Sequence, residues 1–276
     1  MPHDTEKAQP DKAQRFLALH HGDQPLLMPN PWDVGSARVL ASMGFSALAT
    51  TSSGFAATLG RADGAVTRDE AIGHARWLAE AVDIPVSADL ENCFADDPAG
   101  VAETVRLAVA AGLAGCSVED YAKRDEDPIY DHGLATERVA AAAEAAHGGS
   151  VHLVLTARAE NYLRGRPYLA ETIARLQSYQ EAGADVLFAP GVTKAEEIRE
   201  LVASVDRPVS VLGLPGTPPV AELAAMGVKR ISVGGAFAYC AFDALIRAAR
   251  ELREQGTFGY WEQVKSGAKA AHTAFS

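Results

Sequence analysis

Short apolar runs of strand character alternate along the chain with segments that carry helix start signals. Eight such runs have the length of a buried strand. They lie near residues 25–29, 47–51, 84–89, 115–119, 152–157, 186–189, 208–212 and 230–233. Two further helical segments follow the last run, at about residues 237–254 and 260–271. This alternation predicts repeated β-α units.

Turn and cap residues mark the borders of these units. Four glycines follow a helix end and precede an apolar run, namely Gly44, Gly112, Gly183 and Gly227. Glycine in that position adopts the left-handed conformation that leads the chain directly into a strand. Four helix starts carry either a capping box or a cap residue before proline. They are Thr67 with Glu70, Thr193 with Glu196, Asp97 with Pro98, and Thr217 with Pro218.

Eight strands alternating with helices predict an α/β fold of the (β/α)8 TIM-barrel type with extra C-terminal helices. An open, doubly wound sheet has the same local pattern, but the count of eight favours the barrel. No linker or shift in composition divides the chain, so we expect residues 15–276 to form a single domain. Residues 1–14 are polar, and we expect them to form a tail or a docking segment.

Composition narrows the setting. The chain has 276 residues, 48% of them hydrophobic, which is enough for one large core without disulfides. Its three cysteines form no CxxC pair, which favours a reducing compartment and argues against zinc. A net charge of −11 makes a nucleic-acid partner improbable. No apolar run approaches the roughly 20 residues that span a bilayer, so we expect a cytoplasmic protein without a membrane partner.

Polar side chains gather where three neighbouring strands are expected to end, and in such barrels that end holds the active site. The third run ends in Asp89 and Glu91, the fourth in Glu119 and Asp120, and the fifth in Arg158, Glu160 and Asn161. Oxygen ligands without nearby His or Cys suit Mg²⁺, with Mn²⁺ as an alternative, and Arg158 can grip a substrate carboxylate. In the structural alternative, Glu119 and Asp120 are helix-start residues and Arg158 is their ion-pair partner.

The second run leads into a Ser-Ser-Gly turn. Thr51, Ser53, Gly54 and Phe55 belong to this segment. Its backbone N–H groups and hydroxyls can hold a carboxylate or an enolate oxygen. An ordinary polar loop is the simpler interpretation, and the signal is weak when taken alone.

Five motifs in order resemble the isocitrate lyase/phosphoenolpyruvate mutase superfamily. They read TTSSGF at 50–55, LGRADG at 59–64, PVSADLEN at 85–92, SVEDY at 117–121 and TARAEN at 156–161. The resemblance, which runs over nearly the whole chain, implies a (β/α)8 barrel whose terminal helix swaps between partners, in homodimers that pair into homotetramers.

The resemblance also assigns roles to individual residues. Asp89 matches the aspartate nearest the Mg²⁺ ion, and Asp63, Glu91 and Glu119 match the acids that hold its water shell. The family commonly has Asp where this chain has Glu91. Ser53, Gly54 and Phe55 match the loop that receives the 2-oxo acid, and Arg158 matches the substrate-binding arginine. Thr51, Asp89 and Asn161 are further substrate-binding candidates.

The chain departs from the family at two places that matter for the reaction. The lyase lid motif with its catalytic cysteine is absent from residues 121–130, and so is the mutase Lys-x-Asn; Lys123 and Arg124 are the nearby basic residues. A lyase glutamate is replaced by the sequence Ala-Pro-Gly at residues 189–191. Cys93 stands where the family usually has glycine, and a small buried thiol is favoured there over a nucleophile.

The remaining parts suit the stabilisation of a pyruvate-like enolate. The sequence therefore predicts a Mg²⁺-dependent lyase or decarboxylase of a small 2-oxo or 2-hydroxy di- or tricarboxylic acid, with Arg158, Glu119 and Lys123 as catalytic candidates. The general acid or base is left open among Lys123, Glu160 and Tyr121. The alternatives are a phosphonopyruvate-type C–P hydrolase or mutase, which Lys123 and Arg124 would support, and a non-catalytic 2-oxo acid binding protein.

Overall fold

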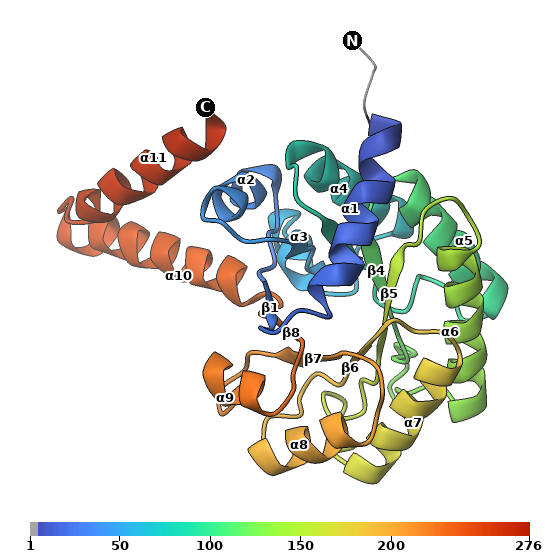
Figure 1. Ribbon diagram of the computed structural model, residues 1–276. Coiled ribbons are helices and arrows are strands. Elements are labelled where there is room, and N and C mark those ends of the chain that lie inside the picture. The colour runs from blue at the N-terminus through green and yellow to red at the C-terminus, as the bar shows by residue number, and fades with distance from the viewer. Residues whose placement is uncertain (1–4) are drawn as a thin grey trace.

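Eight parallel strands form the centre of the computed structural model, which describes residues 5–276 (Figure 1). The strands are β1 (Leu26–Met28), β2 (Leu48–Ala49), β3 (Val86–Asp89), β4 (Gly115–Glu119), β5 (Val154–Arg158), β6 (Val186–Phe188), β7 (Val209–Leu212) and β8 (Arg230–Ser232). Each lies at one of the eight predicted runs, and their order in the sheet is β1-β8-β7-β6-β5-β4-β3-β2. The prediction of a (β/α)8 barrel is confirmed.

The barrel closes between β1 and β2 by single contacts instead of a ladder. The Ala49 N–H donates to the Pro29 carbonyl at 3.2 Å. Asn30 joins both sides of the seam, because its amide nitrogen donates to Thr50 O while its amide oxygen accepts from Val233 N and Gly234 N. These bonds hold the ends of β1, β2 and β8 around one mouth.

Helices surround the sheet and continue beyond it (Figure 1). They are α1 (Thr5–Leu19), α2 (Val34–Ser42), α3 (Ser52–Thr58), α4 (Arg68–Ala81), α5 (Pro98–Ala110), α6 (His132–His147), α7 (Leu169–Glu181), α8 (Ala195–Ala203), α9 (Val220–Ala225), α10 (Ala236–Arg250), the π-helical turn η1 (Glu251–Gln255) and α11 (Trp261–Phe275). Among the described residues, no helix combines the length and the apolar character needed to cross a bilayer.

The predicted turn glycines and two of the four helix starts are confirmed. Gly44, Gly112, Gly183 and Gly227 all have positive φ, between 83° and 104°. Thr67 forms a capping box with Glu70, and the Asp97 side chain accepts from Gly100 N ahead of Pro98 at the start of α5.

The other two helix starts were predicted wrongly. Helix α8 begins one residue later than the Thr193 capping box requires, because Lys194 is still extended and serves as the N-cap. Helix α9 begins only after Pro219. The Thr217 hydroxyl instead bonds within the preceding loop, to Leu212 O and Leu214 N. A short polar side chain can bond backbone groups of a loop as readily as it caps a helix. Thr217 bonds the loop, so it does not cap α9.

Helix α1 corrects the expected boundary at residue 15, which falls inside it; residues 1–4 of the expected tail lie outside the described residues. The Gln9 amide donates to Val109 O at 2.7 Å, and Lys12 donates to Val82 O at 2.8 Å. Phe16 is fully buried against Gly115, at the start of β4. The polar residues that suggested a tail thus dock the helix across the N-terminal end of the barrel.

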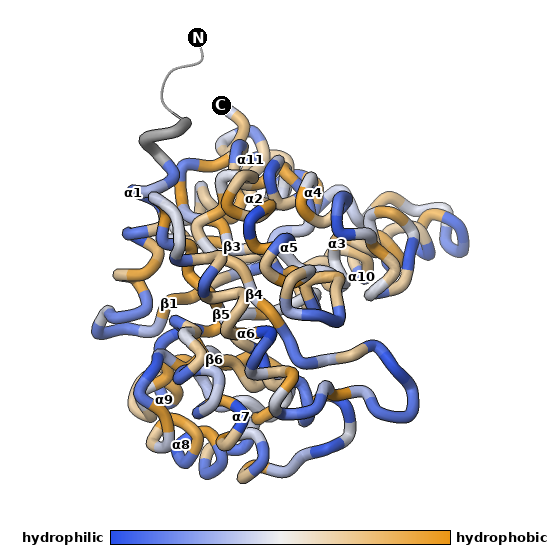
Figure 2. The backbone as a smooth tube through the Cα atoms, turned by 90° about the vertical axis from the view of Figure 1, so that its right-hand side faces the viewer, coloured by the Kyte–Doolittle hydropathy of each residue, from blue (hydrophilic) through white to orange (hydrophobic). Residues whose placement is uncertain are grey.

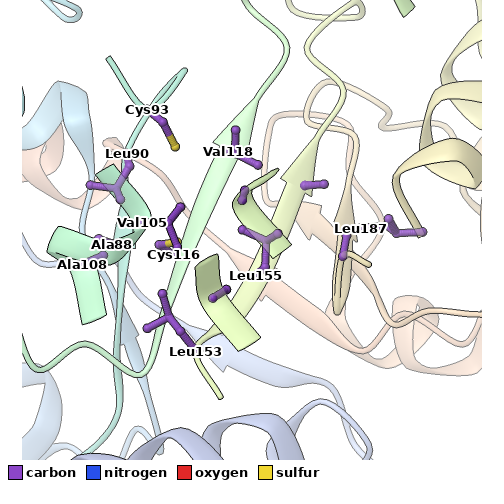
Figure 3. Packing of buried hydrophobic residues seen from close by; sticks show 14 of the residues in the cluster. Ala88, Leu90, Cys93, Val105, Ala108, Cys116, Val118, Leu153, Leu155 and Leu187 are labelled. Atoms are coloured by element: carbon purple, nitrogen blue, oxygen red, sulfur yellow. The ribbon is translucent and has the colours of Figure 1, made fainter. Parts of the chain in front are cut away.

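Apolar packing fills the space between the strands and the helices. Figure 3 shows Cys116 and Val118 of β4 and Leu155 of β5 close to Val105 and Ala108 of α5, all of them buried. In Figure 2 the backbone is mostly hydrophobic at the strands and hydrophilic in the peripheral loops. Burial of apolar area at about 25 cal/mol per Å² makes this layer the main source of stability.

Helices α10 and α11 confirm the two predicted C-terminal helices and form an arm that leaves the barrel (Figure 1). Helix α11 returns to contact α2. Large apolar side chains are exposed along α10, namely Phe237, Tyr239, Phe242, Leu245 and Ile246. An apolar helix face of this size is typical of a surface that another chain covers.

His20 predicts a specific loss of stability in acid. Burial, followed by the charge of Arg230, lowers its pKa to about 3, whereas an unfolded histidine titrates near 6.5. Between these values the unfolded chain binds a proton that the folded chain excludes, so stability falls as the pH drops. Between pH 7 and pH 4 we expect His20→Gln to lose about 3 kcal/mol less unfolding free energy than the unmodified protein. Urea unfolding at both pH values measures this, and equal losses would contradict it.

Candidate active site

The carboxyl ends of β3, β4 and β5 bring charged side chains into contact. Asp89 ends β3, Glu119 ends β4 and Arg158 ends β5, and the sheet register sets Glu119 beside Arg158. The Arg158 guanidinium nitrogens lie 2.9 Å from Asp89, 3.1 Å from Glu119 and 2.7 Å from Glu160. One cation therefore holds three carboxylates at the mouth of the barrel.

Burial makes this cluster electrostatically tight. Burial raises the pKa of Glu119 well above its usual range, although Arg158 opposes the shift. Burial likewise opposes the charge on Arg158, but Glu160, Glu119 and Asp89 outweigh it and raise the pKa of Arg158. The guanidinium is thus fixed in its charged form, whereas Glu119 needs a further cation to ionise easily.

The four predicted metal ligands surround two adjoining cavities. Asp63, Glu91 and Glu119 line a cavity of about 300 Å³, and Asp63 and Asp89 line a second of about 170 Å³. Glu91 is held by Lys123, whose ammonium nitrogen lies 2.6 Å from the carboxylate. The donor set consists of carboxylate oxygens, which fits a hard divalent cation that would share these acids with their present partners.

The Ser-Ser-Gly turn opens helix α3 beside the smaller cavity. The Thr51 hydroxyl accepts from Gly54 N at 3.3 Å, and Ser52 N donates to Asp89 Oδ2 at 3.2 Å. A Cβ at Gly54 would come within 2.6 Å of the Thr51 methyl group, so this approach requires glycine. Thr51 and Ser53 line the cavity. The turn therefore ties the second strand exit to Asp89.

Two of the predicted substrate contacts point elsewhere. The Phe55 ring stacks on His74 with centroids 3.8 Å apart, and it lines neither of the two cavities. Asn161 is fully buried, and its amide donates to Arg166 O and to the Thr172 hydroxyl. Asn161 thereby braces the loop that follows β5, and substrate contact by either residue stays a prediction.

Asp120 and Glu160 also serve the framework. The Asp120 carboxylate accepts from Tyr179 at 2.6 Å, from Arg175 at 3.2 Å and from Glu160 N at 2.8 Å. The Glu160 side chain is fully buried between Arg158 and Arg164. Asp120 therefore has a structural role, but not the expected one, because it starts no helix and its partner is Arg175 instead of Arg158.

The lid region presents Lys123 and Tyr121 to the larger cavity. Lys123 has a left-handed backbone, with φ 55°, and Tyr121 pairs with Ile129 in a short antiparallel bridge. Arg124 turns away and pairs with Asp96, 3.4 Å away. Of the two basic residues that the sequence offers here, only Lys123 lines the cavities.

Cys93 is inert, as expected. The thiol is fully buried, and burial raises its pKa to about 12. Its φ of 57° lies in the left-handed region that favours glycine, which gives a physical reason for the glycine usual in the resembling family. A nucleophilic role would require a thiolate that this environment disfavours.

Two arginines and an asparagine that the sequence did not indicate are among the residues that line the cavities. Arg230 and Asn30 line the smaller cavity, and Arg164 lines the larger one. A signal existed for Arg230, since it is a charged residue at the start of an apolar run. Asn30 and Arg164 lie in loops whose direction the sequence does not reveal.

A second cluster of ligand-type residues lies at the opposite end of the barrel. His147 and His152 each place Nε2 3.0 Å from the Asp185 carboxylate, and their rings stack 4.0 Å apart. The three ligand atoms are close enough to hold a metal ion. The sequence analysis assigned no ligand here, and the cluster is separate from the strand exits because Asp185 precedes β6.

Comparison with known proteins agrees with this geometry. Residues 16–253 match the family model of phosphoenolpyruvate phosphomutase. A Burkholderia cenocepacia protein described as a lyase/mutase has 50% sequence identity and a TM-score of 0.91, and the match covers 93% of this chain and 92% of that chain. A 2-methylisocitrate lyase of Halalkalibacterium halodurans is 27% identical over 90% of this chain and 79% of its own length. An oxaloacetate decarboxylase of Chromohalobacter salexigens is 27% identical over 90% of this chain and 87% of its own length.

Asp120→Ala is expected to destabilise the fold because it leaves the buried Arg175 and Tyr179 without their anion. Breaking a buried ion pair from one side costs about 3–5 kcal/mol. Asp63→Ala is the matched control, since Asp63 is exposed and its removal should change stability by less than about 0.5 kcal/mol. Urea unfolding measures both, and similar values for the two variants would refute the structural role of Asp120.

Proposed function

Because the chain belongs to the phosphoenolpyruvate mutase/isocitrate lyase superfamily, we propose that it is a Mg²⁺-dependent lyase or decarboxylase that forms a pyruvate-like enolate from a small 2-oxo or 2-hydroxy acid. The observation that carries the proposal is the convergence of Asp89, Glu119 and Arg158 on cavities also lined by Asp63 and Glu91. The sizes of these cavities suit a substrate of a few carbon atoms.

In this proposal Asp89 would contact the metal, and Asp63, Glu91 and Glu119 would hold its waters. When bound, Mg²⁺ would supply Lewis-acid stabilisation of the negative charge that develops on the 2-oxo oxygen. Glu119, whose pKa is raised by burial, would then ionise readily. The Lys123 ammonium that now pairs with Glu91 would be released to face the substrate.

Side chains of the protein would position the substrate and transfer the proton. The Ser53 hydroxyl faces the smaller cavity and can donate to a substrate oxygen. Lys123 and Tyr121 line the larger cavity, whereas Glu160 is held by two arginines and lines neither cavity. We therefore assign proton transfer to Lys123, from its ammonium to the enolate carbon.

Two alternatives remain in view. Arg164 joins Lys123 at the larger cavity, which favours a doubly charged group such as a phosphonate and supports a C–P hydrolase or mutase. The absence of the lid cysteine supports a non-catalytic 2-oxo acid binding protein. Among the relatives, one is named a 2-methylisocitrate lyase and one an oxaloacetate decarboxylase. These names favour a lyase or decarboxylase over the two alternatives.

The exposed apolar face of α10 supports a homodimer or homotetramer as the working form, with terminal helices exchanged between copies. Such a face would lie buried in the assembly.

Metal dependence tests the proposed chemistry. Calorimetric titration of pyruvate and oxaloacetate, with Mg²⁺ and with EDTA, should show binding only with the metal. Asp89→Ala should abolish that binding because it removes the acid nearest the ion. Arg124→Ala is a matched control and should bind normally, since Arg124 faces Asp96. Metal-independent binding, or normal binding by Asp89→Ala, would be incompatible with the proposed metal site.

Lys123→Met should separate proton transfer from binding. General acid catalysis contributes about 10²- to 10⁴-fold, so kcat for the reaction found with oxaloacetate should fall within that range while KM changes little. A wild-type value of kcat would assign proton transfer to another group, with Tyr121→Phe as the next variant. Turnover by neither the unmodified protein nor any variant would favour the binding protein.

A further inference from the structure

The floor of the smaller cavity carries a buried cation without a counter-ion. Arg230 is 5% exposed and points inward from the start of β8. Its Nη1 donates to the Thr156 hydroxyl at 2.9 Å. Nε has no hydrogen-bond partner, and among residues 9–276, whose side chains the structure describes, no carboxylate lies at ion-pair distance from the guanidinium.

Other deeply placed arginines have the partners that Arg230 lacks. Arg158 contacts three carboxylates, Arg175 pairs with Asp120 and Glu171, and Arg138 donates to three backbone carbonyls. A buried charge normally persists only when it is paired, because the loss of hydration is costly. Arg230 is therefore a buried cation with which an anion in the smaller cavity can pair.

The surroundings of Arg230 keep it charged yet unpaired. Burial, and then the charge of Arg158, lower its pKa to about 9 although the Asp89 carboxylate opposes the shift, so it remains protonated at neutral pH. His20 lies nearby, and with a pKa of about 3 it is uncharged at neutral pH. The guanidinium borders the smaller cavity, from which an anion can reach it.

Small polar residues leave room above the guanidinium. The interior of such barrels is typically filled by Val, Ile and Leu. Here Ser87 and Ser117 line the cavity of about 170 Å³, and the neighbouring Ser210 hydroxyl is buried without a partner. Buried polar groups without partners are rare, and beside a cavity they indicate a site for a polar ligand.

We propose that Arg230 forms the floor of an anion subsite that receives a carboxylate group of the substrate. Each of the three guanidinium nitrogens of Arg158 already contacts a carboxylate, of Asp89, Glu119 or Glu160. The subsite accepts a planar carboxylate by a charge-assisted hydrogen bond from Arg230. The identity of the substrate rests on the proposed function, whereas the anion subsite rests on the unpaired guanidinium.

Arg230→Met tests the subsite through two opposite effects. Without ligand, the melting temperature should stay equal or rise, because an uncompensated charge is replaced by an apolar side chain of similar volume. Arg175→Met, the matched control, should melt at a lower temperature because it strands Asp120. The probe is oxalate, and calorimetry should show about 10- to 100-fold weaker binding by Arg230→Met, with partial recovery in Arg230→Lys.

The outcomes separate the subsite from the metal chemistry. If oxalate binds equally to the unmodified protein and to Arg230→Met, the subsite is wrong, and the Asp89→Ala result still judges the proposed function. If binding requires Arg230 but neither Mg²⁺ nor Asp89, the subsite stands and the metal chemistry falls. A melting temperature lowered as far as in Arg175→Met, with oxalate affinity unchanged, would show that Arg230 is structural.

Discussion

The contact of one guanidinium with three carboxylates is the constraint on which the mouth of this barrel depends. Arg158 at the end of β5 holds Asp89 from β3, Glu119 from β4 and Glu160 from its own loop. Three carboxylates this close, two of them buried, would repel one another and protonate if they were left alone. The buried arginine therefore lets the fold assemble an acidic site at this end of the barrel.

Because Arg158 is occupied by three acids, the other cations of the site, Arg230 and Lys123, have different roles. A guanidinium that satisfies three acids has little left to offer a substrate, and the unpaired Arg230 lies within the same cavity. Lys123 forms an ion pair with Glu91 at the rim of the site. The site thus has one cation that holds three acids, one at its floor and one at its edge. A net charge of −11 makes such local cations necessary for any anionic substrate.

The sequence predicts the features that follow from strand geometry and misses those that depend on the conformation of loops. All eight strands and the meeting of Asp89, Glu119 and Arg158 follow from apolar runs and from the common direction of parallel strands. The inward turn of Asn161 depends on how the loop after β5 folds back to Thr172, which no local pattern encodes. For residues 1–14 the sequence left a tail and a docking segment open, because the polar side chains of α1 bond backbone carbonyls of residues about 70 to 100 positions away.

Residues with a strained backbone lie where the chain departs from the usual residues of its family. Four described non-glycine residues have positive φ, and all lie beside the site: Glu91, Cys93, Phe94 and Lys123. Strained backbone of this kind costs about 1–3 kcal/mol per residue and persists where the surroundings enforce it. Glu91 has a longer arm than the usual aspartate, and that arm reaches Lys123 at 2.6 Å. Glu91 and the lysine of the lid segment are therefore parts of one contact at the rim of the site.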